Sequence, residues 1–340
     1  MKLIIQIPCL NEESILAQTI AEIPRRIDGI DSVEVLVIDD GSTDETGRIA
    51  LIAGADHIVR HKTNKGLAQA FRSGIDAALE LGADIIVNTD ADNQYPGRFI
   101  PDLIRPILEN KADIVVGDRQ VRQNPNFSWH KRRLQVLGAW VVGRLSGISI
   151  PDAVSGFRAI SREAAMRLNV VSPFSYTIET LIQAGTHQMM VTAVPIETNP
   201  KTRRSRLFRN IPQFITQSLM TMVRIYSMYH PLRMFGCIGI LLSLVGLAPI
   251  VQFVYFYIFE SGAGHIQSLI LGGVFLLMGF MTLLVALLAD LTNFNRRLIE
   301  STLQKIRTLE YEPSSVTQAT PEGPTKLRRV QPAARRRSRG

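Results

Sequence analysis

The first 118 residues alternate short, continuous apolar runs with segments in which apolar residues recur every three or four positions. Continuous runs are typical of strands buried on both faces of a sheet, and the three-to-four spacing is typical of helices packed against it. The pattern predicts strands at Leu3–Pro8, Val33–Asp39, His57–Arg60, Ile85–Thr89 and Ile114–Gly117. It predicts helices at Glu13–Ile27, with Asn11 as N-cap, and at Asp44–Gly54, Leu67–Leu81 and Gly97–Glu109. We therefore expect an α/β domain on a parallel sheet covered by helices.

Two much longer apolar runs follow near the C-terminal end. Met234–Phe259 has 26 residues and Ile266–Ala289 has 24, and neither contains a charge. About 20 apolar residues suffice to cross the hydrocarbon core of a bilayer. A buried helix of a soluble protein is the alternative for either run alone, but two in tandem favour a transmembrane hairpin. Pro249 lies inside the first run, where a membrane helix tolerates it.

The flanking charges predict how the hairpin is oriented. Lys and Arg precede the first run and follow the second, whereas the linking loop, Glu260–His265, has neither. The positive-inside rule places both ends of the hairpin in the cytoplasm. The N-terminus lacks the apolar region and cleavage site of a signal peptide. We expect an integral membrane protein with both termini and its first domain in the cytoplasm, at a bacterial inner membrane.

Residues 206–230, just before the hairpin, combine apolar residues at helical spacing with flanking Arg residues. This pattern predicts an interfacial amphipathic helix, and a helix packed on the soluble domain is the alternative. The remaining boundaries follow: a soluble domain at 1–205, a hairpin region at 231–295 and a cytoplasmic tail at 296–340.

The net charge of +8 is concentrated in this tail. Seven Lys or Arg residues and one acid lie between Pro313 and Gly340, among Pro, Ser, Thr and Gln. From about residue 312 the composition predicts a disordered segment attracted to anionic lipid. Because it has no aromatic residues for base stacking, we do not expect nucleic acid as a partner.

Polar residues follow three of the predicted strands. The strand ends read Pro8-Cys-Leu-Asn-Glu12, Asp39-Asp-Gly-Ser-Thr-Asp44 and Asp90-Ala-Asp-Asn-Gln94. Ligands of parallel sheets bind at the carboxyl ends of the strands. Clustered carboxylates there suit a divalent cation that holds a diphosphate. Ordinary turn formers are the alternative, which we favour only for Asp44. A turn must aim Asp90 and Asp92 at one ion, because in extended chain they point to opposite faces.

Together these segments resemble a known family. PCLNEE, VIDDGSTDET, NKGLAQA and DADNQYP resemble, in order and spacing, family-2 glycosyltransferases with the GT-A fold. GDRQ, SGFRAIS and the hairpin make the chain similar to polyprenyl-phosphate (dolichyl-phosphate type) mannosyl- or glucosyltransferases. The resemblance implies a Rossmann-like nucleotide-sugar domain followed by the amphipathic helix and the hairpin. It covers residues 1 to about 210 and, with the hairpin, extends to about 300.

The resemblance also implies roles for individual residues. The nucleotide sugar would contact the ends of the first, second and fourth strands: Pro8, Leu10, Glu12, Asp39, Asp40, Asp90, Ala91 and Asp92. The metal, Mg²⁺ or Mn²⁺, would be held by Asp90, Asp92 and Gln94. The acceptor phosphate would be docked by Arg119, Arg132 (or Arg133), Arg203, Arg204, Ser205 and Arg206. Asp90, Asp92 and Arg119 would therefore carry the catalysis.

The expected reaction is transfer of a hexose from UDP-glucose or GDP-mannose to a polyprenyl phosphate, with inversion at the anomeric carbon. Two alternatives remain: a transferase with another lipid or glycan acceptor, using Glu179 as base, and an inactive membrane scaffold. Two segments depart from the family pattern, Val136 where a hydroxyl residue is frequent and Arg203–Leu207 in place of a Gly-x-Ser-Lys type segment. The hairpin also makes homo-oligomers an expectation.

Overall fold

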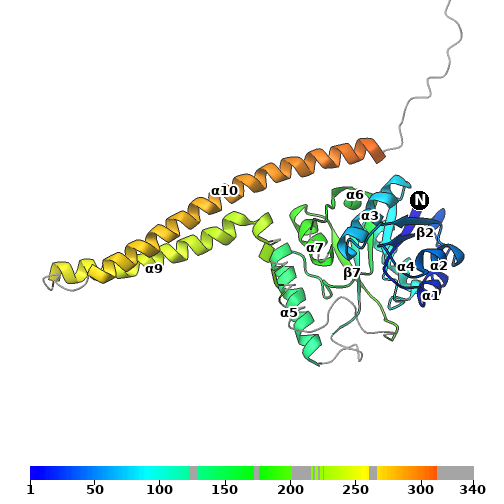
Figure 1. The fold of residues 1–340 in the computed structure, drawn as a ribbon, viewed down its shortest axis with the longest axis horizontal. Helices are drawn as coiled ribbons and strands as arrows, with labels where there is room; N and C mark the ends of the chain where they lie inside the picture. The colour runs from blue at the N-terminus through cyan, green and yellow to red at the C-terminus, as the bar shows by residue number, and fades with distance from the viewer. Residues whose placement is uncertain are drawn as a thin grey trace, which may run out of the picture.

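The computed structural model describes residues 1–121, 129–171, 176–200, 216, 219–220, 223–224, 226–259 and 266–311. An α/β domain forms one end of the molecule, and two long helices extend away from it (Figure 1). Arg203, Arg204, Ser205 and Arg206, the hairpin loop and the tail beyond Tyr311 lie outside the described residues. Most of the expected amphipathic helix does too, although the described positions between Thr216 and Tyr229 are helical.

A seven-stranded mixed sheet runs through the domain in the order β3-β2-β1-β4-β6-β5-β7. Its strands are β1 (Lys2–Cys9), β2 (Ser32–Asp39), β3 (His57–Arg60), β4 (Ile85–Asn88), β5 (Ile114–Asp118), β6 (Arg158–Ser161) and β7 (Val191–Pro195). The five strands expected from the apolar runs are present, almost within the predicted bounds. The five expected strands run in the same direction, as predicted, but the whole sheet is mixed, because the unpredicted strand β6 pairs antiparallel with both β4 and β5.

Helices cover both faces of the sheet. They are α1 (Leu16–Ala21), α2 (Thr46–Ile52), α3 (Leu67–Glu80), a 3₁₀ turn η1 (Gly97–Phe99), α4 (Ile100–Leu108), α5 (Trp129–Ser146), α6 (Arg162–Arg167) and α7 (Tyr176–Thr186). One core layer lies between the sheet and α1, α2 and α4. A second lies between the sheet and α3, α6 and α7, where the rings of Phe71 and Tyr176 stack at 4.1 Å.

The first helix is shorter than predicted at both ends. It starts at Leu16, and Asn11 does not cap it: Asn11 has a φ of 54° and its Oδ1 accepts a hydrogen bond from the Thr43 amide at 2.8 Å. The helix stops before Pro24, because a proline disfavours helical backbone in the residue before it. Asn11 therefore joins the loops after β1 and β2.

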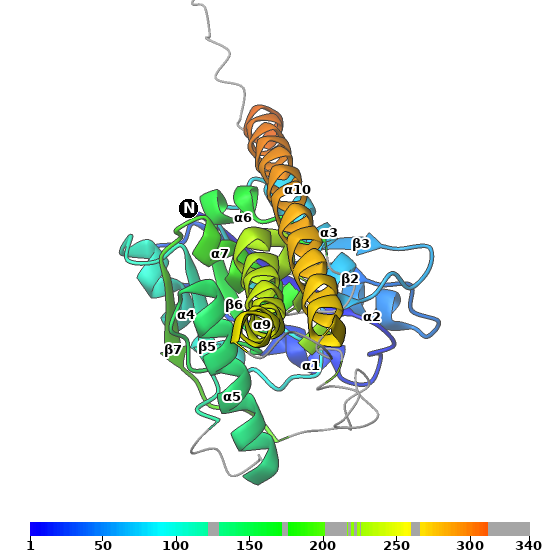
Figure 2. The same cartoon turned by 90° about the vertical axis from the view of Figure 1, so that its left-hand side faces the viewer.

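The two apolar runs form α9 (Pro231–Phe259) and α10 (Ile266–Tyr311), which lie side by side (Figures 1 and 2). Both are long and apolar enough to cross a membrane. Small residues allow their backbones to approach, since Gly239 and Gly246 of α9 face Gly279 and Gly272 of α10. The helix α10 continues for 46 residues to Tyr311, so it includes the first residues of the segment expected as the tail and ends just before residue 312, where disorder is expected to begin.

Candidate active site

The loops after β1 and β2 form one wall of the candidate site. The Asn11 amide donates to Ser42 Oγ at 2.9 Å, and the Glu12 amide donates to Thr46 Oγ1 at 2.8 Å. These bonds hold Leu10 and Glu12 beside Asp39, since Cys9 at the end of β1 pairs in register with Asp39 at the end of β2. Pro8 is buried within β1. The structure thus brings together the nucleotide contacts expected at these two strand ends.

Asp39 has one carboxylate oxygen that accepts no hydrogen bond. Its side chain is fully buried, and Oδ1 accepts the Ser42 amide at 2.8 Å. Oδ2 is left without a hydrogen-bond donor, although Arg60 Nε lies 3.2 Å from it in an ion pair. A buried acceptor without a donor is costly, which is why such atoms are usually satisfied. Asp39 is therefore suited to accept an N–H or O–H from a ligand that displaces Arg60.

The carboxylate of Asp40, in contrast, is hydrogen-bonded to neighbouring residues of the protein. Its carboxylate accepts the amides of Lys65 at 2.9 Å and Gly66 at 2.8 Å, and His61 Nδ1 lies 2.7 Å from Oδ1. Gly66 has a φ of 91°, a conformation that favours glycine. Asp40 thus fixes the loop that leads into α3, and a direct contact between Asp40 and the nucleotide stays a prediction.

The turn after β4 carries Asp90, Ala91, Asp92 and Gln94. Asn93 has a φ of 54°, which reverses the chain directly after Asp92. The Gln94 side-chain amide donates to Asp92 at 2.6 Å, so Gln94 orients this carboxylate. Thr19 Oγ1 of α1 donates to the Ala91 carbonyl at 3.0 Å and holds the turn against the domain.

Asp90 lies in a close-fitting pocket made by Gly156 and Tyr176. A methyl group at Gly156 would lie 3.0 and 3.1 Å from the two Asp90 oxygens and 2.9 Å from the Tyr176 hydroxyl. Asn88 fixes both neighbours, because its Nδ2 donates to the Gly156 carbonyl at 2.8 Å and to the Tyr176 hydroxyl at 3.0 Å. Burial, with the nearby Asp90 charge, raises the pKa of Tyr176, which keeps its hydroxyl neutral.

Arg119, at the end of β5, lies beside this turn and is paired with Asp152. Its Nε and Nη2 lie 2.6 and 2.8 Å from the two Asp152 oxygens, in a bidentate geometry. Burial opposes its charge, but Tyr95, Asp152 and Asp90 together raise the pKa of Arg119. Burial also raises the pKa of Tyr95 to about 12. A fixed guanidinium therefore lies within electrostatic reach of Asp90.

Arg158 is a site residue that the sequence did not single out. It is 1% exposed, and burial lowers the pKa of its guanidinium to about 10. It donates to the carbonyls of Ala153, Ser155 and Thr177 at 2.8 to 2.9 Å and to Thr180 Oγ1 at 2.6 Å. These bonds join α7 to the loop that carries Asp152 and Gly156. Arg158 thus supports the partners of both Arg119 and Asp90.

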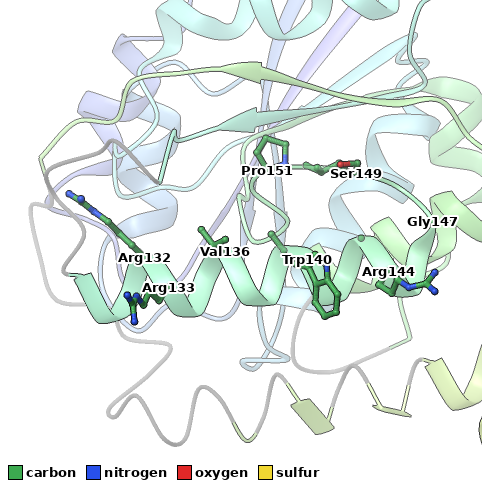
Figure 3. Close-up of a pocket in the computed structure, with 11 residues that line it drawn as sticks. Arg132, Arg133, Val136, Trp140, Arg144, Gly147, Ser149 and Pro151 are labelled. Carbon is green, nitrogen blue, oxygen red and sulfur yellow. The ribbon is translucent and has the colours of Figure 1, made fainter.

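A cavity of about 1090 Å³ opens along α5 (Figure 3). Arg132 and Arg133 lie near one end of its wall and Arg144 near the other, with Val136 and Trp140 between them. Pro151 lines it too, and the next residue is Asp152, the partner of Arg119. A cavity with cations at its ends and apolar groups between them suits an amphiphilic anion.

The donor set is compatible with a divalent cation shared with a phosphorylated ligand. Among the described residues, no group of three or more His, Cys, Asp or Glu could hold a metal by itself. Asp90 and Asp92 nevertheless lie on one turn, and hard cations such as Mg²⁺ are often held by one or two carboxylates together with substrate phosphates. The residues present therefore fit a metal whose remaining ligands come from the substrate.

Comparison with known proteins agrees with this geometry. The glycosyl transferase family 2 model matches residues 4–168. An uncharacterized protein of Methanocaldococcus jannaschii is 30% identical over 202 residues, covering 58% of this chain and 81% of the relative. A dolichol-phosphate mannosyltransferase of Pyrococcus furiosus is 33% identical over 192 residues, covering 54% of this chain and 53% of the relative.

The fold also matches a solved structure, the glucosyl-3-phosphoglycerate synthase of Mycobacterium tuberculosis in complex with Mn²⁺, UDP-glucose and phosphoglyceric acid. The TM-score is 0.52 at 22% identity, over 66% of this chain and 80% of that one. This similarity concerns the fold, and it agrees with the GT-A-like mixed sheet. The family match and the relatives together show that the chain belongs to glycosyl transferase family 2 through its domain at residues 4–168.

Proposed function

We propose that this glycosyltransferase moves a hexose from a nucleotide sugar to the phosphate of a membrane polyprenyl phosphate, with inversion at the anomeric carbon. The observation that carries the proposal is the placement of Arg119 within electrostatic reach of Asp90, beside a cavity lined with Arg and apolar residues. The relative named for transfer to dolichol phosphate supports the acceptor class.

On the donor side, Asp39 would accept a hydrogen bond from the base or ribose through its unsatisfied Oδ2. Asp90 and Asp92 would hold Mg²⁺ or Mn²⁺, which would neutralise charge on the departing nucleoside diphosphate. Gln94 would keep Asp92 in position through the 2.6 Å hydrogen bond between their side chains. UDP-glucose and GDP-mannose are the donors we favour.

On the acceptor side, Arg119 would dock the lipid phosphate, since a guanidinium offers paired donors to phosphate oxygens. Arg132 lies at the cavity wall, and Arg203, Arg204, Ser205 and Arg206 would add further contacts. A phosphate is already an anion at neutral pH, so its attack needs no strong general base. Attack on the face opposite the departing diphosphate inverts the anomeric centre.

Two features argue against the alternatives. Glu179 is fully buried and accepts the Val171 amide at 3.0 Å and the Gln183 side chain at 3.2 Å, an arrangement that stabilises the fold and does not suit a catalytic base. The ordered acidic turn at Asp90–Gln94 argues against an inactive scaffold.

The two long apolar helices of the hairpin support the proposal of a lipid acceptor. We propose that α9 and the apolar part of α10 span the membrane with the catalytic domain on the cytoplasmic side, at a bacterial inner membrane. The prenyl chain would stay in the bilayer while its phosphate reaches the site. Assembly of several chains through the hairpin stays a prediction.

The test uses the full chain in proteoliposomes with undecaprenyl or dolichyl phosphate, Mg²⁺ or Mn²⁺, and labelled UDP-glucose, GDP-mannose or UDP-GlcNAc. We expect chelator-sensitive transfer to lipid from at least one donor, with the opposite anomeric configuration by NMR. Asp92→Asn should abolish transfer, whereas Asp102→Asn, at an exposed acid on α4, should preserve it. Absence of transfer from all three donors would refute the proposal.

A further inference from the structure

A single stripe of residues runs along the whole of α10. The residues of this helix that are buried, Gly272, Gly279, Ala286, Asn293 and Arg307, are separated by seven residues or a multiple of seven. Positions seven apart lie on nearly the same face of a helix, with a drift of only about 20°. Over the five steps of seven from Gly272 to Arg307 this drift adds up to about 100°, so the buried line turns slowly around α10 from the face that packs on α9 to the face that meets the catalytic domain.

At the base of the hairpin this stripe contacts the chain just before α9. Asn293 Nδ2 donates to the Tyr229 carbonyl at 3.1 Å, and the Arg296 guanidinium lies 3.9 Å from the centre of the Tyr229 ring. Arg296 Nη2 also pairs with Glu300 at 2.5 Å. Tyr229 is 2% exposed, so this first contact is well packed.

Further along α10, Arg307 binds the helix to the catalytic domain near α3 and α6. Its guanidinium donates to the Leu168 carbonyl at 2.9 Å, to the Met166 carbonyl at 3.3 Å and to Asp76 Oδ1 at 2.8 Å. The Arg307 side chain is only 7% exposed. Arg162 of α6 adds a bond to the Tyr311 carbonyl, close to the end of the same helix. Figure 1 shows this end of α10 beside α6 and α3.

The docked point is connected to the donor side of the site through the helix α3. Asp76 lies on α3, and α3 begins at the loop whose Gly66 amide is held by Asp40. Asn293 and Arg307 are about 21 Å apart along a helix that rises ~1.5 Å per residue. Tyr229, the partner of Asn293, packs in a buried cluster with Val116 and Ile178 of the domain. Two contacts this far apart on one helix therefore restrict both tilt and rotation of the domain about α10.

We propose that Arg307 is a positioning residue: by docking α10 on Asp76, Met166 and Leu168, it holds the catalytic domain at a fixed height and angle above the bilayer. This inference rests on the proposed function, because the height matters only when the acceptor phosphate is confined to the membrane. A small displacement of the reacting groups suffices to slow a reaction by about 100-fold.

The test compares two acceptors with the full-length chain in proteoliposomes. One is a long polyprenyl phosphate in the bilayer, and the other is a short, water-soluble prenyl phosphate. Arg307→Ala should lower kcat/KM for the embedded acceptor by about tenfold or more while changing that for the soluble acceptor less than about twofold. Arg307→Lys should recover part of the loss, because it keeps a cation opposite Asp76.

Lys305→Ala is the matched control, since it removes the same charge from an exposed position two residues away. Its kcat/KM for both acceptors should equal that of the unchanged protein. Three outcomes would each overturn the inference. In the first, Arg307→Ala lowers kcat/KM equally for both acceptors; in the second, it leaves both values unchanged. In the third, Lys305→Ala lowers kcat/KM for the embedded acceptor as much as Arg307→Ala does. Failure of the unchanged protein to transfer to either acceptor would instead refute the proposed function.

Discussion

Arg119 and Asp152 form a bidentate ion pair, with donor–acceptor distances of 2.6 and 2.8 Å, in which both side chains are largely buried. The two residues are distant in sequence and come from the end of β5 and from the loop before β6. In this pair Asp152 fixes the plane of the guanidinium. The orientation of the whole guanidinium is thereby fixed, which is the property that the proposed docking of the acceptor phosphate requires.

Asp152→Asn should therefore weaken the acceptor side of the reaction. Asn preserves the shape of Asp152 but removes the charge and one of the two acceptor oxygens that hold Arg119. We expect kcat/KM for the lipid acceptor to fall by about tenfold to 100-fold while the Kd for the nucleotide sugar changes little. Steady-state kinetics and calorimetry measure the two quantities. A loss of donor affinity with normal acceptor kinetics would contradict this role.

Gly156→Ala should damage the donor side. The added methyl group would lie 3.0 Å or slightly more from both Asp90 oxygens and 2.9 Å from the Tyr176 hydroxyl, so Asp90 must move. We expect at least about a tenfold drop in metal-dependent activity, because a displaced carboxylate no longer places the cation correctly. The measurement is activity across a Mn²⁺ titration.

Gly138→Ala is the control for that variant, since a methyl group at Gly138 would meet nothing within 4 Å. Circular dichroism of both variants should match that of the unchanged protein. Full activity of Gly156→Ala at ordinary Mn²⁺ concentrations would show that Asp90 has room to adjust.

Gly279→Leu should separate the two long helices. A side chain there would come within 2.7 Å of the Ser243 amide and 2.8 Å of the Gly239 carbonyl, both backbone atoms of α9. Overpacking of this kind costs about 1 to 3 kcal/mol. The midpoint of thermal unfolding in detergent should fall, whereas Gly273→Leu, at a position where an added Cβ meets nothing within 4 Å, should not lower it. Equal midpoints for the two variants would argue against this helix contact.

His187 should make the stability depend on pH. Burial lowers its pKa, reinforced by Arg167, Arg296 and Arg297 and opposed by Glu300. The unfolded chain then binds a proton at a higher pH than the folded chain does. Stability is therefore complete above the ordinary histidine pKa of 6.5 and is lost as the pH falls below it. Denaturant unfolding of the unchanged protein and His187→Gln checks this, and an equal pH dependence in both would contradict it.

The strands of the first half, and the positions of the acids at their ends, were largely predictable because their signals are local, whereas the binding of the donor by these acids stays a prediction. Each expected strand is a continuous apolar run, and the acids that matter come directly after those runs, as Asp39 and Asp90 do. Asn and Gly at turn positions also agree with the left-handed backbone seen at Asn93 and Gly66. Because these strands are neighbours in the sheet, their ends bring the side chains together, and no long-range contact has to be predicted.

The missed features depend on contacts between distant segments. The strand β6 escaped prediction because Arg158 falls in it, and a charged residue argues against a buried strand until three carbonyls and Thr180 are brought around it. Asp152 has no local pattern that marks it as the partner of Arg119. The charges from residue 296 onward were assigned to the tail, although the seven-residue spacing of Gly272, Gly279, Ala286 and Asn293 continues to Arg307.

The antiparallel strand β6 has a consequence for how such enzymes diversify. The segment that carries the cavity helix α5 leaves the sheet at Asp118 on β5 and returns at Arg158 on β6, and these two strands are hydrogen-bonded neighbours. A segment whose ends are anchored side by side tolerates changes in length at a small entropic cost. Under the proposed function this segment carries the acceptor side, so its length and sequence can change without altering the strand ends that we propose bind the nucleotide sugar.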